Sequence, residues 1–436
     1  MRNRTLIFLL LAAITPLSIM GQNFCSNGQP SNTKLVCQIP FATGVYSNQG
    51  STSIDPAVQQ TAAVFNTAIA TAVSQLPLAS SSSGVVEVYR AGVPQTYNSL
   101  GPILTDRAST VGRHALFLSF TASQFMFTAV DGIDLNKLPF AYKATSNNDP
   151  NTATFTQETL DVHFKIDQYV AIATFGVTNK LDVSMILPIE RVSIGSAANN
   201  ISEYFVNTAN GTGSGPVSTT QPYAQGIASG IGDIVFAGKY LFWSGERSNL
   251  SFGLTERVPT GDDRNYLGSG AWGTNPYAVF SYVARVSPHV RLGYEWNSET
   301  ELNPNLVHKG SNLALPGGLQ YDAGADLAVA TSGWAKHLTV AGDLMGDQYQ
   351  NAPRLTQNTT SISYTDPTKQ PPNQTVPLTG VIAVNSTYWI NDISAGFKWN
   401  PYHKFIFTGN VLFQLNNVGM RARPTPLLGL SYEFGR

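Results

Sequence analysis

Residues that could do chemistry recur at every second position along much of this sequence. Between 230 and 258, Ile234, Phe236 and Tyr240 share one parity, whereas Asp233 and Lys239 share the other. A period of two is typical of a β-strand whose two faces meet different surroundings. We therefore predict an interior lined by charges of both signs: Asp161, His163, Lys165, Asp182, Glu190, Asp233, Lys239, Arg257, Arg291, Glu295, Asp322, Asp326, Asp343, Asp392, Lys398 and Lys404.

Two roles are open for these charges. They can line a hydrated path and tune which solute passes, or they can pair with one another and fill a narrow interior. A ring of about twelve strands lies between small filled barrels and wide porins in diameter. The sequence leaves both roles open.

A catalytic role needs more than charge. Asp161 and His163 are two residues apart, and Ser119 or Ser184 could lie across the interior from them. A histidine oriented by an acid next to a serine is the arrangement of a hydrolase that would act on lipid or ester. The chain has only six histidines and no G-x-S-x-G motif. A hydrogen-bonding role for His163 is therefore favoured, and we predict no enzyme activity.

Metal and cofactor sites are not expected. Gly261-Asp262-Asp263 could supply oxygen ligands to calcium, but a polar turn is the favoured interpretation. The two cysteines, Cys25 and Cys37, have no histidine nearby. In an oxidising compartment they predict one local disulfide, worth about 3 kcal/mol of stability.

The first residues have the features of a signal peptide, and we predict that 1–21 are removed on export. Arg2 and Arg4 precede a short apolar core at 6–14, and Gly21 offers a small residue at the cleavage point. No later apolar run reaches the roughly 18 residues of a membrane-spanning helix. Charged residues are only 12% of the chain, against about 25% in an average soluble domain. The formal net charge of -1 provides no basic surface for nucleic acid.

Residues 22–110 differ in pattern from the rest and form a separate N-terminal segment. Asp55 and Pro56 are typical of a helix start, and an apolar stripe then predicts a helix over 56–76 that ends before Pro77. The Ser- and Gly-rich stretch at 80–84 predicts a flexible link. The apolar stripe must be buried. The helix could plug the interior, pack beneath it or bind a periplasmic partner, and a plug is favoured.

The remainder, 111–436, is predicted to be an up-and-down β-barrel of about twelve antiparallel strands in the outer membrane of a Gram-negative-type bacterium. Short turns and long polar loops alternate between the strands, as in outer-membrane barrels. The sheet must close into a barrel because hydrocarbon offers no hydrogen-bond partners to the backbone groups of a free strand edge. The predicted strands are 114–128, 157–176, 181–195, 230–243, 247–258, 275–286, 289–299, 319–331, 335–347, 388–399, 403–416 and 425–435.

Several details follow from this pattern. Glu256 falls on the lipid-facing parity and is expected near the rim. Phe125 and Phe127 do not fit the parity of the residues before them, which predicts a bulge. The long loops near 129–156, 196–229 and 348–387 are expected to be irregular. Aromatic residues near strand ends predict interfacial girdles, formed by Trp243, Trp296, Trp334, Tyr388, Trp389, Trp399 and Tyr402.

The stretches GIGDIVFAGKY, GLTERVPTGDDRNYLGSGAWG and RLGYEW resemble the family of outer-membrane barrels named for a meta-pathway of phenol degradation. The motif residues here are Pro259-Thr260-Gly261-Asp262, a glycine-rich loop at 268–273, and Leu292-Gly293-Tyr294. FGVTNKLDVSMILP at 175–188 also resembles the family's turn into a strand that ends in proline. The resemblance covers 112–436, and it implies a barrel that takes up or exports small organic molecules. The N-terminal segment departs from the simplest members, which argues against a fully open pore.

The favoured hypothesis is a channel for small, hydrophobic or aromatic, molecules through a charged lumen that the N-terminal segment partly occludes. The alternative outside catalysis is a surface scaffold that binds through the loops 196–229 and 348–387. The expected partners of the protein are outer-membrane lipid, the solute, and assembly machinery that recognises the last strand at 428–434.

Overall fold

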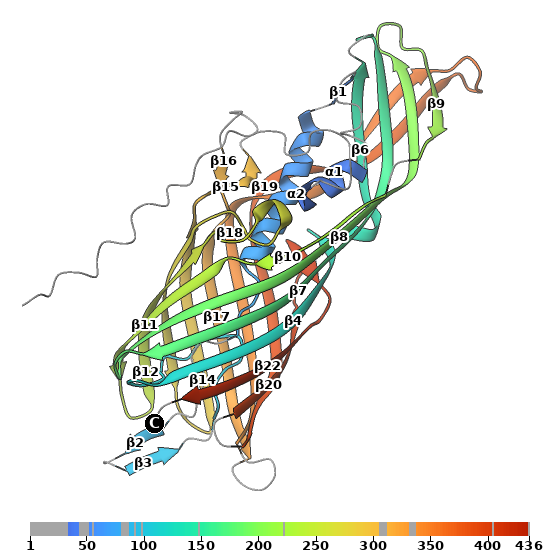
Figure 1. Ribbon diagram of the computed structural model, residues 1–436. Coiled ribbons are helices and arrows are strands. Elements are labelled where there is room, and N and C mark those ends of the chain that lie inside the picture. Colours follow the sequence, from blue (N-terminus) through green and yellow to red (C-terminus); the bar gives the residue numbers. More distant parts are fainter. Residues whose placement is uncertain are drawn as a thin grey trace, which may run out of the picture.

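The computed structural model describes residues 34–42, 52–54, 56–79, 87–90, 93–96, 99–146, 149–220, 223–304, 312–330, 337–402 and 405–434. Within them, 12 antiparallel strands form a closed barrel (Figure 1). The wall closes where the last strand pairs with the first, with Leu430 opposite Phe120. In wall order the strands are β4 (Leu116–Val130), β7 (Thr152–Gly176), β8 (Leu181–Asn207), β11 (Ile234–Ser244), β12 (Ser248–Val258), β13 (Gly273–Tyr282), β14 (Val286–Asn297), β17 (Gly318–Ala330), β18 (Leu338–Thr365), β19 (Asn373–Tyr402), β20 (Phe405–Gln414) and β22 (Thr425–Phe434).

This architecture confirms the predicted fold class, and each predicted strand overlaps one strand of the wall. The reason is the alternation itself, because a closed sheet needs one face for its interior and another for its exterior. The two ends of the barrel differ. Short connections such as 177–180 and 245–247 lie at one end, where β22 also ends; we call it the turn end.

The longer connections lie at the opposite end, which we call the loop end. They contain further elements, namely β5 (Ile133–Asp134), η3 (Leu135–Lys137), β6 (Leu138–Ser146), β9 (Gly213–Ser218), β10 (Ala224–Ile231), η4 (Asp263–Asn265), β15 (Glu299–Pro304), β16 (Asn312–Ala314) and β21 (Met420–Ala422). β10 pairs with β8 just beyond β11, so it continues the wall at this end.

The outer face of the barrel is apolar over a continuous band. Phe120, Phe236 and Leu428, for example, are 50%, 48% and 69% exposed. Glu256 lies near the rim, where its carboxylate accepts hydrogen bonds from Trp272 Nε1 at 2.7 Å and Thr274 Oγ1 at 2.8 Å. The band is therefore suited to hydrocarbon.

The aromatic residues predicted to form interfacial girdles lie mostly on this face. Trp243, Trp296, Trp389 and Tyr402 are exposed as girdle residues would be, and Trp399 is half-buried. Tyr388 is instead buried and packs on Tyr349, with ring centroids 5.3 Å apart, so its assignment to a girdle is wrong. Trp334 lies outside the described residues.

The bulge predicted near Phe125 is also wrong. β4 pairs with β7 in unbroken register from Leu116 opposite Phe175 to Phe127 opposite Phe164. Phe125 and Phe127 point inward along with Phe117, and they are buried. They are large and apolar because a helix, rather than water, fills the interior at that height.

Four strands continue past the barrel at the loop end into a projecting lobe (Figure 1). It contains 138–160, 196–218 and 352–386, which we call the outer lobe, and β1 (Thr52–Ile54) pairs with β6 at its edge. The predicted irregular loops at 129–156, 196–229 and 348–387 are thus largely strand. Threonine, valine and tyrosine favour strands, but outside a membrane both faces can be polar, so the apolar alternation that reveals a barrel strand is lost.

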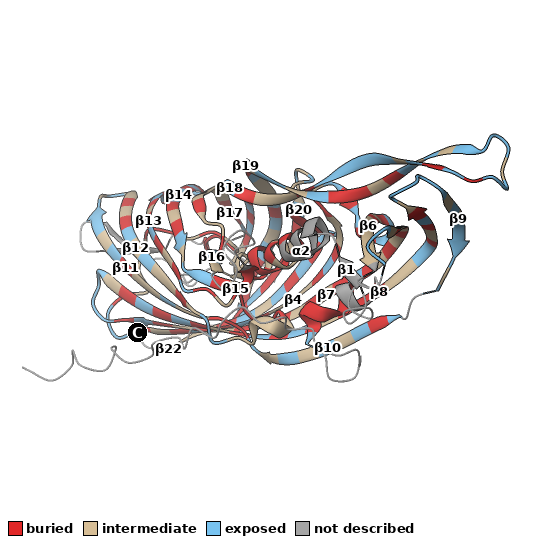
Figure 2. Ribbon diagram, turned by 90° about the horizontal axis from the view of Figure 1, so that it is seen from above, coloured by how far each residue is buried: buried red, intermediate tan, exposed pale blue. Residues whose placement is uncertain are grey.

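Several described parts of the N-terminal segment lie inside the wall. η2 (Leu35–Cys37) and α1 (Gln38–Ala42) lie against β8 and β10, and α2 (Pro56–Ser74) lies within the ring of strands (Figure 2). α2 confirms the predicted helix, ending ahead of Pro77 as expected. β2 (Glu87–Arg90) and β3 (Val93–Thr96) form a hairpin near the turn end, before residues 99–113 join β4 (Figure 1).

No helix in the described part of the chain is long and apolar enough to cross a membrane. The predicted signal peptide and the 80–84 link lie outside the described residues. Cys37 is buried, but Cys25 also lies outside them, so the Cys25–Cys37 disulfide stays a prediction.

Candidate channel interior

Most of the charged side chains predicted to line the interior do point into the barrel. The side chains of five of them are almost fully buried, namely Asp182, Glu190, Asp326, Asp343 and Lys398. The inward-facing set comprises Asp182, Glu190, Asp233, Lys239, Arg257, Arg291, Glu295, Asp322, Asp326, Asp343, Asp392 and Lys398. Lys404 lies outside the described residues.

Asp161, His163 and Lys165 do not belong to that interior. Their side chains share the outer face with Tyr169, and those of His163 and Lys165 are 69% and 37% exposed. The opposite parity, with Val162, Phe164 and Ile166, faces inward and is buried. At this height the interior is apolar because α2 occupies it, so the charged face of β7 is the outer one.

This placement also separates the residues of the hypothetical hydrolase. Ser119 bonds to Ser431 at 2.9 Å and Ser184 to Thr174 at 2.8 Å, both inside the wall. His163 lies outside it, 3.4 Å from Asp161. Neither Ser119 nor Ser184 lies on the same side of the sheet as His163, so the catalytic arrangement that the sequence leaves as an alternative does not form.

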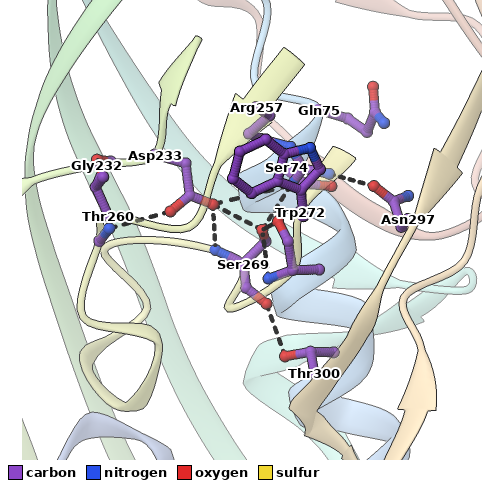
Figure 3. Close-up of polar contacts among 12 residues, drawn as sticks. Ser74, Gln75, Gly232, Asp233, Arg257, Thr260, Ser269, Trp272, Asn297 and Thr300 are labelled. Atoms are coloured by element: carbon purple, nitrogen blue, oxygen red, sulfur yellow. Dashed lines mark hydrogen bonds and ion pairs between the residues drawn. The ribbon is translucent and has the colours of Figure 1, made fainter. Parts of the chain in front are cut away.

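A polar cluster at the loop end joins the wall to the connection between β12 and β13 (Figure 3). Arg257 pairs with Glu295 at 2.9 Å and bonds to Ser269 at 2.6 Å. The Asp233 carboxylate accepts from Ser269 N at 2.8 Å and from Gly261 N at 3.1 Å. These bonds fold the loop 259–272 inward over the mouth of the barrel.

That loop contacts α2. Tyr266 is fully buried, and its hydroxyl donates to Asn66 Oδ1 at 2.6 Å. Thr67, the next residue of α2, donates to the Leu302 carbonyl at 2.9 Å. On its apolar side, α2 buries Phe65, Ile69 and Val73 in one cluster with residues of β4 and β7. Full burial of such a side chain contributes about 1.5–3 kcal/mol.

A cavity of about 240 Å³ lies below the C-terminal end of α2. Gln75 reaches into its upper side and donates to Glu295 Oε2 at 2.5 Å. Arg291 crosses it, pairing with Asp322 at 3.1 Å and lying 4.5 Å from the centroid of the Tyr277 ring. A second cavity of about 80 Å³ lies between α2 and the wall formed by β4, β19 and β21, and Arg421 there pairs with Asp392 at 2.6 Å.

Residues 99–113, which we call the strap, occupy the interior near the turn end. Arg107 pairs with Asp326 at 3.2 Å and Asp106 with Lys239 at 3.2 Å. Thr105 bonds to His289 at 2.7 Å, and His289 bonds to Asp343 at 2.9 Å. Lys398 donates to the Pro102 carbonyl, and Val111 N donates to Asp182 at 2.9 Å. Many of the wall's predicted charges are therefore partners of the N-terminal segment rather than of one another.

Sequence reasoning missed the strap, together with Asp347 and Arg421. Asp347 shares the parity of Asp343, so the alternation contained the signal. His289 likewise shares the parity of Arg291. The strap and Arg421 lie in stretches without a period, where nothing in the spacing indicates an inward position.

The aspartates of the turn Gly261-Asp262-Asp263, for which the sequence favours a polar turn over a calcium site, contact protein groups. Asp262 pairs with Lys34 at 2.8 Å and accepts from Asn265 at 2.8 Å. Asp263 accepts the backbone N–H of Arg264 at 2.8 Å. In the described ranges, no group of three or more His, Cys, Asp or Glu is placed to hold a metal ion.

A closed up-and-down barrel with an apolar outer band and a polar interior defines a transmembrane β-barrel of the outer-membrane type. The family model described as "Putative MetA-pathway of phenol degradation" matches residues 144–353. This match confirms the resemblance found in the sequence. No curated protein matches the chain.

Solved structures similar to this chain include three outer-membrane proteins. The COG4313 outer membrane channel from Pseudomonas putida F1 is 11% identical, with 75% of this chain and 98% of that one covered and a TM-score of 0.44. A FadL homologue from Pseudomonas aeruginosa is 10% identical, covering 81% and 99%, with a TM-score of 0.30. The toluene transporter TbuX from Ralstonia pickettii is 10% identical, covering 74% and 90%, with a TM-score of 0.25.

Proposed function

We propose that the protein is an outer-membrane channel for small molecules, hydrophobic and aromatic ones included, whose lumen the N-terminal segment partly occludes. The observation that carries the proposal is the layered interior. α2 lies at the loop end, the strap lies at the turn end, and the cavity of about 240 Å³ between them is lined by both and by the wall. A protein whose interior served only stability would have no need of a polar cavity there.

The charges suggest which solutes pass. Arg257, Arg291 and Lys239 each have a carboxylate partner. In the described part of the chain, the buried carboxylate of Asp182 makes no ion pair with a cation. Since this leaves an unpaired carboxylate in the lumen, anions are disfavoured relative to uncharged molecules.

The proposal includes the route to the membrane. Residues 1–21 act as a signal peptide, short turns face the periplasm, and the outer lobe faces the medium. Assembly machinery recognises the last strand, where Leu428, Leu430 and Phe434 alternate outward and are 69%, 42% and 47% exposed.

Swelling of proteoliposomes tests the proposal. We expect a neutral pentose to enter vesicles that contain the full chain faster than the corresponding pentonate. Asp182→Asn should narrow that difference, whereas Glu299→Gln, which changes an exposed carboxylate at the loop end, should leave it unchanged. Absence of swelling with either solute, or faster entry of the pentonate, would contradict the proposal.

A second function is favoured by the outer lobe. Its β18–β19 hairpin carries exposed polar pairs, such as Thr359 with Thr379 at 3.0 Å and Ser363 with Thr375 at 3.1 Å. Such a surface suits the recognition of another macromolecule. If the chain is a scaffold, deletion of 352–386 abolishes binding of the partner macromolecule. If it is a channel, the same deletion leaves solute entry unchanged.

A further inference from the structure

A groove of about 740 Å³ lies on the outer face of the wall, where the strands leave the apolar band toward the outer lobe. The interior network does not use it. Its lining comes from β4, β7, β8 and β10 and from the residue after β21, and includes Met126, His163, Lys165, Ser193, Ile227 and Arg423.

Strand register places these residues in a row. Lys165 lies opposite Met126 on one side and Ser193 on the other, and Ser193 lies opposite Ile227. Arg423 extends the row, because its backbone N–H donates to the Met126 carbonyl at 2.9 Å. Two cations therefore flank one methionine.

The charge of the groove is positive on balance. Lys165, His163 and Arg423 are exposed to solvent in part or fully, as is Arg191 one row closer to the apolar band. The acids near them are Asp167, 3.0 Å from Lys165, and Asp161, 3.4 Å from His163. Asp167 also accepts a hydrogen bond from Gln124 at 2.7 Å. Arg423 makes no ion pair in the described part of the chain.

The groove also has a defined depth relative to the apolar band. Tyr169 pairs with Ile189, and Ile189 pairs with Ile231; these three side chains are 44%, 43% and 50% exposed. That row is the last apolar one on these strands. Arg191 and Asp167 follow it, and Lys165 follows them. The cations therefore lie at the level where the headgroups of the surrounding leaflet begin, beside the exposed side chains of Ile227 and Tyr223.

We propose that this groove binds the phosphorylated headgroup of a lipid of the outer leaflet. Lys165 and Arg423 bind the phosphate, because charge-assisted N–H···O bonds to phosphate are the strong ones available to these side chains. His163 lies beside them as a further donor, and Met126 and Ile227 contact the apolar part of the lipid. The inference rests on the proposed orientation of the barrel, with the outer lobe facing the medium.

Titration of the full chain in detergent micelles tests this site. The probe is a bis-phosphorylated glucosamine-disaccharide lipid, compared with the same lipid after removal of its phosphates. We expect the double variant Lys165→Gln with Arg423→Gln to bind the phosphorylated lipid about thirtyfold more weakly, from the loss of two cation contacts. The matched control, Lys180→Gln with Arg285→Gln, removes two exposed cations at the turn end and should bind like the native chain.

Three results would overturn the inference. The double variant could bind as well as the control, the dephosphorylated lipid could bind as well as the phosphorylated one, or inorganic phosphate at equal concentration could displace the lipid. Solute entry measured on the same variants keeps the two proposals apart. The groove is outside the wall, so loss of lipid binding with unchanged pentose entry would separate it from the channel.

Discussion

At the scale of single residues, the buried charges of the lumen depend on partners from distant parts of the chain. Arg107 of the strap and Asp326 of β17 are both almost fully buried and lie 3.2 Å apart. Taking either charge out of water is costly, and only the other charge and the surrounding hydrogen bonds offset that cost. Ser99 supplies one such bond to Asp326, and His289 Nδ1 lies 3.7 Å away.

Removing one partner of this pair should therefore be worse than removing both. We predict that Arg107→Met destabilises the barrel by about 3–5 kcal/mol, and that adding Asp326→Leu restores most of the loss. The temperature at which the folded, heat-modifiable band disappears on a gel measures the effect. A double variant no more stable than Arg107→Met alone would show that the pair is not the source of the loss.

Glu158 of the outer lobe is a buried acid of a different kind. It lies eleven residues before Tyr169 on β7, beyond the apolar band, at a break in register where Gln157 pairs with Ser202 and Thr159 with Asn199. The side chain is 1% exposed, and neither carboxylate oxygen has a hydrogen-bond partner. Burial, with a smaller contribution from Glu203, raises the pKa of Glu158 to about 8.

The stability of the outer lobe should consequently fall as pH rises. Because the folded form holds the proton up to about pH 8 and the unfolded form releases it near pH 4.5, the loss develops between these values, at no more than about 1.4 kcal/mol per pH unit. We predict that Glu158→Gln removes the effect, with slower proteolytic cleavage of the lobe at pH 9 and little change at pH 5. Glu299→Gln is the control. Equal pH dependence in the native chain and in Glu158→Gln would refute the prediction.

At the scale of elements, the loop 259–272 is what couples α2 to the wall. Asp233 anchors it from below, Tyr266 enters the apolar cluster around α2, and Thr300 Oγ1 donates to the Ser269 carbonyl at 2.8 Å. The residues that carry the family resemblance therefore hold the helix in the mouth of the barrel. Gly268 is required at its position, since a Cβ there would lie 2.3 Å from Asp233 Oδ1 and 2.9 Å from the Gly261 Cα.

Gly268→Ala should therefore displace the loop and loosen α2. We predict faster amide hydrogen exchange in 259–272 and in α2, with the barrel strands unaffected. Gly238→Ala is the matched control, because a Cβ at Gly238 would meet nothing within 4 Å. Exchange that rises equally in both variants, or in neither, would contradict the role given to this loop.

The elements also show what the sequence can and cannot predict. All strands of the wall were predictable because each separates hydrocarbon from a lumen. The inward position of residues such as Asp233 and Lys398 followed from parity. The assignment failed at Asp161, His163 and Lys165, since α2 makes the interior apolar at that height and reverses the usual relation between polarity and face. The strap was not predictable because residues 99–113 have no period, and their positions depend on charges distant in sequence.

At the scale of the whole molecule, the chain is a barrel that holds α2 and the strap within its wall. The N-terminal segment contacts the lumen at two levels, through Gln75 and Glu295 above the cavity and through Arg107 and Asp326 below it. Loops and segments inside larger barrels limit the free cross-section. The rate of solute passage should therefore depend on the strength of the contacts between the N-terminal segment and the wall at both levels.

Single-channel conductance in a planar bilayer tests this account most directly. The full chain is compared with a chain that lacks 22–110 and with the full-length variant Asp106→Asn with Arg107→Gln, which weakens the strap without deleting it. We predict a small conductance for the native chain, a larger one for the strap variant and the largest for the truncated chain. Silence from all three, with each still heat-modifiable as a folded barrel, would contradict the account and leave the lumen as a filled network.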